Sequence, residues 1–178
     1  HSQMQDHEKN IWVAGQLRPY SKYVKMYQIE KDFGDDAIIK ISSDGKILYK
    51  KSVIEILIEN EILPNNLKNL KHWNEEDRLD PIHLNDIEPA LFDSKYWKTG
   101  DVFLSTPVES AIIHYRPSTN KVINYITGPF AGQHDVDIIS EKEISIFNNN
   151  NFIFENEHSE VLFYNFETYK FKKLFNEQ

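Results

Sequence analysis

The sequence predicts an all-β fold, and more specifically a partial β-propeller of about three four-stranded antiparallel blades with a short helical insertion. Short apolar strands separated by turn residues recur along the second half of the chain, at roughly the 40-to-50-residue period of propeller blades. An apolar hairpin earlier in the chain is a looser copy of the same unit. Because a single blade cannot bury both of its faces, blades stack around an axis.

The first predicted blade covers about residues 9–51. Its clearest feature is the turn at Asp44 and Gly45 between two apolar runs, because glycine accepts the positive φ that tight hairpin turns need. The sequence shows no innermost strand for this blade. Residues 1–4 resemble a cloning scar and are set aside, so the single predicted domain covers residues 5–178.

A helical insertion is predicted over residues 52–79. Apolar residues from Ser52 to Leu63 follow a helical spacing. Pro64 cannot continue this helix, because it lacks a backbone N–H and its ring clashes with the preceding turn. A further turn of helix is expected near residues 67–73.

The second and third predicted blades cover about residues 82–128 and 132–176. Their third strands agree best: residues 110–121 align with residues 159–170, and Ser, Tyr, Thr and Lys recur at identical offsets. Three blades are fewer than the roughly four to eight that normally close a propeller ring. We therefore expect the ring to be completed by missing sequence or by a second copy of the chain, as a homodimer.

Composition excludes several classes of function. The 178 residues include 20 basic and 28 acidic side chains, for a net charge of −8, so a polyanion such as nucleic acid would be repelled and is not expected as a partner. The absence of cysteine excludes thiol catalysis and disulfides. The apolar runs are too short to span a bilayer.

Two histidines stand at positions that the alignment makes equivalent. His83-x-x-Asp86 aligns with His134-x-x-Asp137, which places both histidines at the start of innermost strands. Innermost strands line the axial channel, so we expect the two imidazoles to converge there as acid, base or nucleophile. The alternative is that each is a partly buried histidine bonded to a loop. Asp86 and Asp137 are expected to accept backbone N–H bonds near the strand starts.

A metal site is another possible use of these residues, since imidazole and carboxylate suit many divalent ions. The ligands would be the two histidines together with Asp86 and Asp135, but their spacing matches no diagnostic pattern, and we expect neither a metal nor another cofactor. Arg116 is expected at a solvated hairpin tip, with His114 beside it in the strand, and neither has a predicted catalytic role.

Residues 80–151 carry motifs that resemble one known family. These motifs are Asp80-Pro-Ile-His-Leu-Asn-Asp-Ile, Trp97-Lys-Thr-Gly-Asp-Val-Phe-Leu-Ser, Ser110-Ala-Ile-Ile, and Gly132-Gln-His-Asp followed by Ile146-Phe-Asn-Asn. They resemble the bacterial arylsulfotransferases that work without the nucleotide sulfate donor. The resemblance implies a six-bladed propeller, periplasmic or secreted, that moves sulfate from one phenol to another through a sulfated histidine and needs no cofactor.

The resemblance also implies roles for single residues. His134 matches the histidine that accepts the sulfuryl group, and His83 matches a second active-site histidine that binds sulfate oxygens or acts as acid to the leaving phenol. Asn85 would support His83. The family uses an arginine a few residues after the Leu-Ser strand, but Pro107 occupies that position here, so a bidentate partner for the anion is missing.

Two interpretations remain open. The first is an arylsulfotransferase-like enzyme acting on small phenolic or sulfated compounds, with His134 as nucleophile and His83 as its partner. The second is a non-catalytic propeller that binds a ligand or another protein. Transfer of sulfate from 4-nitrophenyl sulfate to phenol would separate the two.

Overall fold

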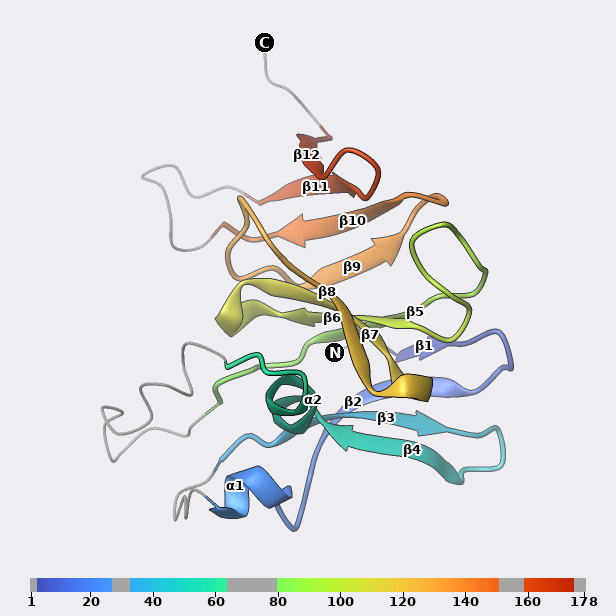
Figure 1. Cartoon of the computed structure of the whole chain (residues 1–178), viewed down its shortest axis with the longest axis vertical. Helices are drawn as coiled ribbons and strands as arrows, with labels where there is room; N and C mark the ends of the chain where they lie inside the picture. The colour runs from blue at the N-terminus through green and yellow to red at the C-terminus, as the bar shows by residue number, and fades with distance from the viewer. Residues whose placement is uncertain (1–2, 27–32, 64–79, 151–158, 175–178) are drawn as a thin grey trace, which may run out of the picture.

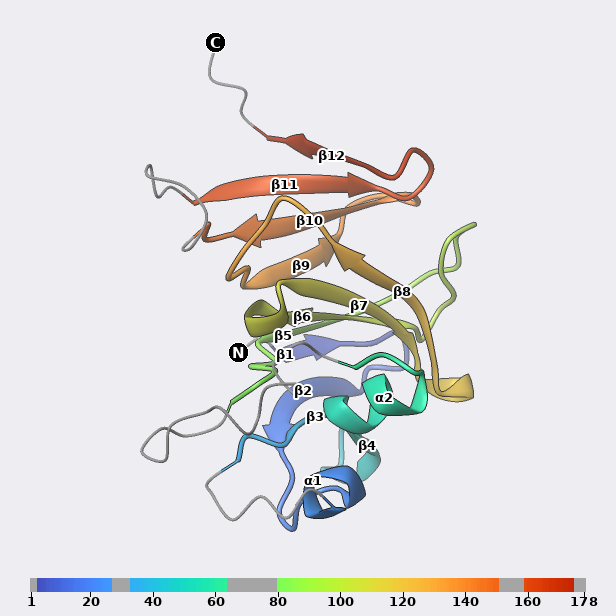
Figure 2. The same cartoon turned by 60° about the vertical axis from the view of Figure 1, so that its left-hand side comes forward.

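The computed structural model describes residues 3–26, 33–63, 80–150 and 159–174. These residues form three four-stranded antiparallel sheets, which confirms the all-β prediction. In each sheet the strands are neighbours in the order in which they follow along the chain, as in a propeller blade. Figures 1 and 2 show the three sheets succeeding one another along the long axis of the molecule.

The first sheet contains a strand that the sequence did not reveal. Its strands are β1 (Gln3–Gln5), β2 (Ile11–Gln16), β3 (Asp36–Ile41) and β4 (Ile47–Ser52). β1 is the innermost strand that was missing from the predicted blade, and its Met4 pairs with Trp12 of β2. Gln3 and Met4, set aside as a scar on the basis of sequence, are therefore part of the sheet. A strand of three residues with both glutamines exposed has no apolar alternation from which to predict it.

The second and third sheets repeat one another. The second comprises β5 (Asp86–Pro89), β6 (Val102–Thr106), β7 (Ala111–Arg116) and β8 (Lys121–Thr127), with the short 3-10 helices η2 (Pro107–Glu109) and η3 (Pro117–Thr119) between strands. The third comprises β9 (Asp135–Ile138), β10 (Glu143–Asn148), β11 (Glu160–Asn165) and β12 (Lys170–Lys173). Asn120 before β8 and Tyr169 before β12 both have positive φ, at 53° and 57°. Because the two turns match, the predicted alignment of the third strands is confirmed.

Two helices accompany the first sheet. α2 (Val53–Glu59) confirms the predicted helix but is shorter, because Asn60 ends it before Pro64 is reached. Ser52 caps the helix by accepting the backbone N–H of Glu55, a contact that contributes about 1 kcal/mol. α1 (Lys22–Met26) was not predicted. The turn of helix expected near residues 67–73 lies outside the described residues.

The first hydrophobic core lies where α2 meets the first and second sheets. The helix buries one face, because its apolar residues recur at helical spacing. The buried members of this core are Trp12, Val24, Phe33, Ile38, Val53, Ile54, Ile56, Leu57, Ile82, Leu84, Ile87, Val102, Leu104, Ile113 and Tyr115. The helix therefore belongs to the core that joins the two sheets rather than to a separate insertion.

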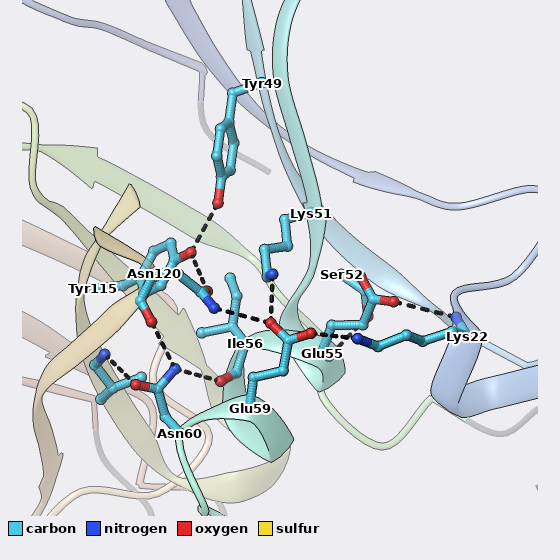
Figure 3. A network of polar contacts seen from close by, with 11 residues as sticks. Lys22, Tyr49, Lys51, Ser52, Glu55, Ile56, Glu59, Asn60, Tyr115 and Asn120 are labelled. Carbon is cyan, nitrogen blue, oxygen red and sulfur yellow. Dashed lines mark hydrogen bonds and ion pairs between the residues drawn. The ribbon is translucent and has the colours of Figure 1, made fainter. Parts of the chain in front are cut away.

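Polar contacts at the end of α2 reinforce this junction (Figure 3). The carboxylate of Glu59 accepts hydrogen bonds from Lys22 Nζ at 2.7 Å, Lys51 Nζ at 2.6 Å and Asn120 Nδ2 at 2.9 Å. The lysine bonds lower the pKa of Glu59 to about 2. Asn60 continues the network by accepting the backbone N–H of Val122 in β8. The end of the helix is thus tied to both sheets.

The second hydrophobic core lies between the second and third sheets and is rich in aromatic residues. Trp97 meets Phe103 edge-on at 5.7 Å and Phe166 at 5.4 Å between ring centroids. Such edge-to-face pairs add to the free energy gained from burial. The buried members are Ala90, Trp97, Phe103, Ile112, Ile126, Phe130, Val136, Ile144, Ile146, Leu162, Tyr164 and Phe166.

Candidate functional site

The residues predicted to form the site lie at the start of the innermost strands β5 and β9, which are neighbours in adjacent sheets (Figure 1). His83 and Asn85 precede β5, and His134 immediately precedes β9. Asn85 is buried, and its Nδ2 donates a hydrogen bond to the backbone oxygen of Gln133 at 3.0 Å. The structure therefore holds Asn85 against the segment that carries His134.

The two histidines are not equivalent in the repeat, and the predicted alignment of the strand starts is wrong by two residues. The backbone N–H of Asn85 donates a hydrogen bond to the backbone oxygen of Ser105 in β6, the strand paired with β5. In the same way, the backbone N–H of His134 donates to the backbone oxygen of Phe147 in β10, the strand paired with β9. Asn85 therefore corresponds to His134.

The conformation of the preceding residues supports the corrected alignment. His83 has a φ of 53°, and its counterpart Gly132 has a φ of 62°. Glycine adopts this left-handed conformation without strain, whereas histidine does so at a cost. The predicted alignment paired Asp86 with Asp137, whereas the corrected alignment pairs it with Asp135. Because these two acids occupy alternate positions of β9, the sequence alone fits either pairing.

His134 is exposed, and the segment that carries it is fixed by amide side chains. Asn148, buried at the end of β10, accepts the backbone N–H of Ala131 at 2.9 Å. Asn149 Nδ2 donates to the backbone oxygen of Gly132 at 2.8 Å. Gln133 is fully buried and donates from Nε2 to the backbone oxygen of Ala111 at 2.9 Å. These contacts, which sequence patterns did not reveal, present an accessible imidazole on a fixed backbone.

His83 faces a pocket that it shares with the first sheet. Its Nδ1 lies 2.9 Å from Oδ2 of Asp80, and its side chain is 41% exposed. The pocket has a volume of about 350 Å³. Its lining residues are Ala14, Gly15, Gln16, Asp36, Asp80, His83 and Leu84. His83 thus belongs to a site on the first-sheet side of β5, and its expected convergence with His134 in a channel stays a prediction.

Asp36 is the member of this pocket that sequence reasoning missed. Burial raises the pKa of the Asp36 carboxyl to about 6. The backbone N–H of Leu84 donates a hydrogen bond to Oδ2 of Asp36 at 2.7 Å, and this bond offsets only part of the increase. The nearby charge of Asp80 raises the pKa further. Nothing near Asp36 in the sequence indicates this environment, because Leu84 and Asp80, which help to create it, come from the segment before β5.

Pro107 is buried at the first position of η2. This position therefore supplies no guanidinium, although the sequence resemblance implies an arginine there. Three buried polar atoms nearby have no hydrogen-bond partner among the described residues: Asn85 Oδ1, Ser105 Oγ and Gln133 Oε1. Bound water or a ligand is the usual partner of such atoms.

Carboxylates of β5 join the second sheet to the third. Asp86 accepts the backbone N–H of Val136 at 3.0 Å, which confirms its predicted structural role. Glu88 accepts the N–H of Ile138 more weakly, at 3.4 Å. Burial raises the pKa of Glu88 to about 7, and the nearby charges of Asp137, Asp86 and Asp135 raise it further.

The raised pKa of Glu88 predicts that stability falls as the pH rises. The native state binds more protons than the unfolded state between about pH 4.5 and pH 7, so the contribution of Glu88 is lost across this interval. We expect Glu88→Gln, which imitates the protonated acid, to increase the free energy of unfolding by roughly 2 kcal/mol at pH 8 and little at pH 4.5. Urea denaturation at both pH values measures this.

The matched control is Glu141→Gln, an exposed carboxylate between β9 and β10, for which we expect no pH-dependent change. A Glu88→Gln protein less stable than wild type at pH 8 would show that the ionised carboxylate, and not its protonated form, is favoured between the sheets.

Arg116, whose side chain is 27% exposed, and fully buried His114 both bond to buried Asp101, so the expectation of a solvated hairpin tip for Arg116 is wrong, whereas His114 lies within the strand as expected. Asp101 receives two hydrogen bonds from Arg116, both at 2.7 Å, and one from Nε2 of fully buried His114 at 2.9 Å. Asn124 bonds to the other ring nitrogen of His114. His114 and Arg116 occupy alternate positions of β7 and both reach Asp101, a contact that the sequence pattern does not indicate. This cluster has a structural role.

Within the described ranges, no group of three or more histidine, aspartate or glutamate side chains is arranged to hold a metal ion. Asp86, one of the candidate ligands, instead bonds to the backbone of Val136.

Comparison with known proteins gives the family. Residues 1–176 match the arylsulfotransferase (ASST) family. The chain belongs to this family. The arylsulfotransferase resemblance drawn from residues 80–151 is therefore confirmed and extends over nearly the whole chain. No curated protein and no solved structure matches the chain. Among the described residues of this arylsulfotransferase-family chain, no helix is long and apolar enough to cross a membrane.

Proposed function

We propose that this protein transfers a sulfuryl group from one phenol to another through a sulfated His134. The observation that carries the proposal is the placement of His134, exposed at the start of β9 on a backbone fixed by its neighbours, in a chain of the arylsulfotransferase family. A neutral imidazole nitrogen is a good nucleophile. The alternative, a propeller that only binds its ligand, is one outcome of the test below.

The proposed reaction has two steps. In the first, a ring nitrogen of His134 attacks the sulfur of an aryl sulfate, the bond between sulfur and the phenolic oxygen breaks, and a phenolate leaves. In the second, the oxygen of an acceptor phenol attacks the same sulfur and its proton passes to water, while the sulfur–nitrogen bond breaks and the electron pair returns to His134. Asn85 supports this by holding the backbone of Gln133, the residue before the nucleophile.

Isolation of the covalent intermediate tests the proposal. Wild-type protein mixed with 4-nitrophenyl sulfate and no acceptor should release about one equivalent of nitrophenol in a burst and gain the mass of one sulfuryl group. The covalent intermediate should accumulate because the second step is slow without an acceptor. Peptide mapping should locate the sulfuryl group on His134. Absence of both burst and mass gain would refute the enzyme proposal, and phenol binding without turnover would favour the ligand-binding alternative.

We also propose that a further sheet of the same kind packs against the third sheet. The support comes from the carboxylates of β5, because Asp86 and Glu88 bind the backbone of β9 whereas their counterparts Asp135 and Asp137 are exposed. Additional sequence or a second copy of the chain would supply that sheet, as blade stacking requires. A molar mass of one chain by light scattering would exclude the second copy. By the same family resemblance we propose a periplasmic or secreted location.

A further inference from the structure

The first sheet has an outer face, turned away from the second sheet, that carries apolar side chains. On this face Ile11 of β2 pairs with Ile41 of β3, and Val13 pairs with Ile39. Trp12, which alternates with them along β2, belongs to the core shared with the second sheet. Ile11 is 37% exposed, and the other three side chains of the outer face are partly exposed. A sheet normally buries such an apolar face against another layer.

The second and third sheets carry two apolar pairs at the matching positions of their middle strands. These pairs are Val102–Tyr115 and Leu104–Ile113 in the second sheet, and Ile144–Tyr164 and Ile146–Leu162 in the third. All of them are buried in the core that each sheet shares with the sheet before it. Among the described residues, no preceding sheet covers the first one. Its outer face is therefore the same surface of the repeat without the layer that buries it.

The third sheet shows the complementary face of the repeat, without a following sheet among the described residues. Phe147 of β10 is 41% exposed on this face and pairs with Asp135 and Val161. In the second sheet, Ile112 is the counterpart of Val161 and is fully buried in the core shared with the third sheet. The two ends of the stack of sheets thus expose the two halves of one kind of contact.

Hydrogen-bond acceptors complete this half of the contact. Asp86 and Glu88 of the second sheet accept two alternate backbone N–H groups of β9, the innermost strand of the following sheet. Their counterparts Asp135 and Asp137 occupy alternate positions of β9 and are exposed. They are available to accept two alternate N–H groups from the innermost strand of a further sheet.

The strand β1 has donors at the spacing that these acceptors need. The backbone N–H of Asp6 bonds to the backbone oxygen of Asn10. Because bonded and non-bonded pairs alternate in an antiparallel ladder, the N–H groups of Gln3 and Gln5 point away from β2, to the inner edge of the sheet. Val136 and Ile138 present their N–H groups to Asp86 and Glu88 from the same edge of β9.

We propose that the third sheet of one copy of the chain packs against the outer face of the first sheet of a second copy. The inference rests on the further sheet proposed above and names its source. Asp135 and Asp137 of one copy accept the N–H groups of Gln3 and Gln5 of the other, and the apolar faces bury one another. Two such head-to-tail contacts close a ring. The ring contains three sheets from each copy, which falls within the roughly four to eight of closed propellers.

Light scattering during size-exclusion chromatography tests the contact. Wild-type protein should have the mass of two chains, twice 21.0 kDa. Ile11→Arg and Phe147→Arg should each have the mass of one chain, because each variant places a charge in both contacts of the ring. Both side chains are exposed, so circular dichroism should show a normal fold. The matched control is Ile123→Arg in β8, also 37% exposed, which should keep the mass of two chains.

A mixture of the two variants identifies the head-to-tail arrangement. The third sheet of the Ile11→Arg protein and the first sheet of the Phe147→Arg protein are both intact, so the mixture should form a species of two chains through one contact. Sedimentation velocity measures this species. An interface that joins identical faces would instead persist in one of the variants alone and would overturn the proposal, as would a mixture that stays at one chain.

A wild-type mass of one chain would refute the second copy and assign the further sheet to additional sequence. The nitrophenol burst, measured on the same samples, separates this inference from the proposed sulfuryl transfer. A burst from protein of one chain would refute the ring of two copies and retain the sulfotransferase. Protein of two chains that gives no burst and gains no sulfuryl mass would retain the ring and refute the sulfotransferase.

Discussion

Replacement of His134 by alanine is expected to abolish sulfuryl transfer. Alanine has no nucleophile to accept the group, so we expect neither a nitrophenol burst nor a sulfated protein, and a steady-state rate lower by at least roughly 10³-fold. Because His134 is exposed and its backbone contacts come from its neighbours, the variant should fold normally. Burst kinetics with 4-nitrophenyl sulfate, together with circular dichroism, provides the measurement.

The matched control is His7→Ala, which removes an exposed histidine from the turn between β1 and β2. It should leave both the burst and the steady-state rate unchanged. A His134→Ala protein that still becomes sulfated, for example on His83, would assign the nucleophile to the other histidine and refute the role proposed for His134.

Removal of the Asp101 carboxylate is expected to cause a large loss of stability. Asp101→Ala leaves the buried imidazole of His114 and the guanidinium of Arg116 without their partner, and breaking a buried charged pair costs about 3 kcal/mol. Burial alone would raise the pKa of Asp101, but bonds from His114, Arg116 and the backbone of Lys98 outweigh it and hold the pKa below its usual range. Urea denaturation measures the free energy of unfolding.

The sign of the pH dependence follows from the lowered pKa of Asp101. Its stabilising contribution is complete above the unfolded-state pKa of about 4 and is lost as the pH falls below that value, so the difference between wild type and Asp101→Ala should shrink in acid. Arg116→Lys should show an intermediate loss, because lysine keeps the charge but not the two parallel hydrogen bonds. Glu141→Ala is the surface control. A loss for Asp101→Ala no larger than that of this control would contradict the structural role of the cluster.

Much of the fold could be predicted because its determinants are local. Strand alternation, hairpin turns and the spacing of α2 each depend on residues close together in the chain, and the repeat adds the order of strands within a sheet. β1 was missed because three residues, two of them exposed glutamines, carry too little pattern. α1, five residues long, was missed because only Val24 is buried.

The candidate site was predictable in part. The motifs around His83, Asn85 and His134 identify the strand starts that the structure places in neighbouring sheets. Their register was not predictable, because it depends on which residue bonds to the partner strand, and the alternating acids of β9 fit two alignments. Sequence patterns also did not predict which residue bonds to each histidine.

The sequence by itself determined the all-β class, the repeated four-strand unit, the arylsulfotransferase family and the histidines worth testing, since these depend on patterns and motifs within short segments. Only the tertiary structure decided that Asn85 holds the segment of His134 and that Asp36 and His83 share a pocket. The raised pKa of Glu88 was likewise decided only by the tertiary structure. The physical reason is that burial and hydrogen bonding at these sites join residues from different sheets, about one repeat apart in the chain, where no local pattern records them.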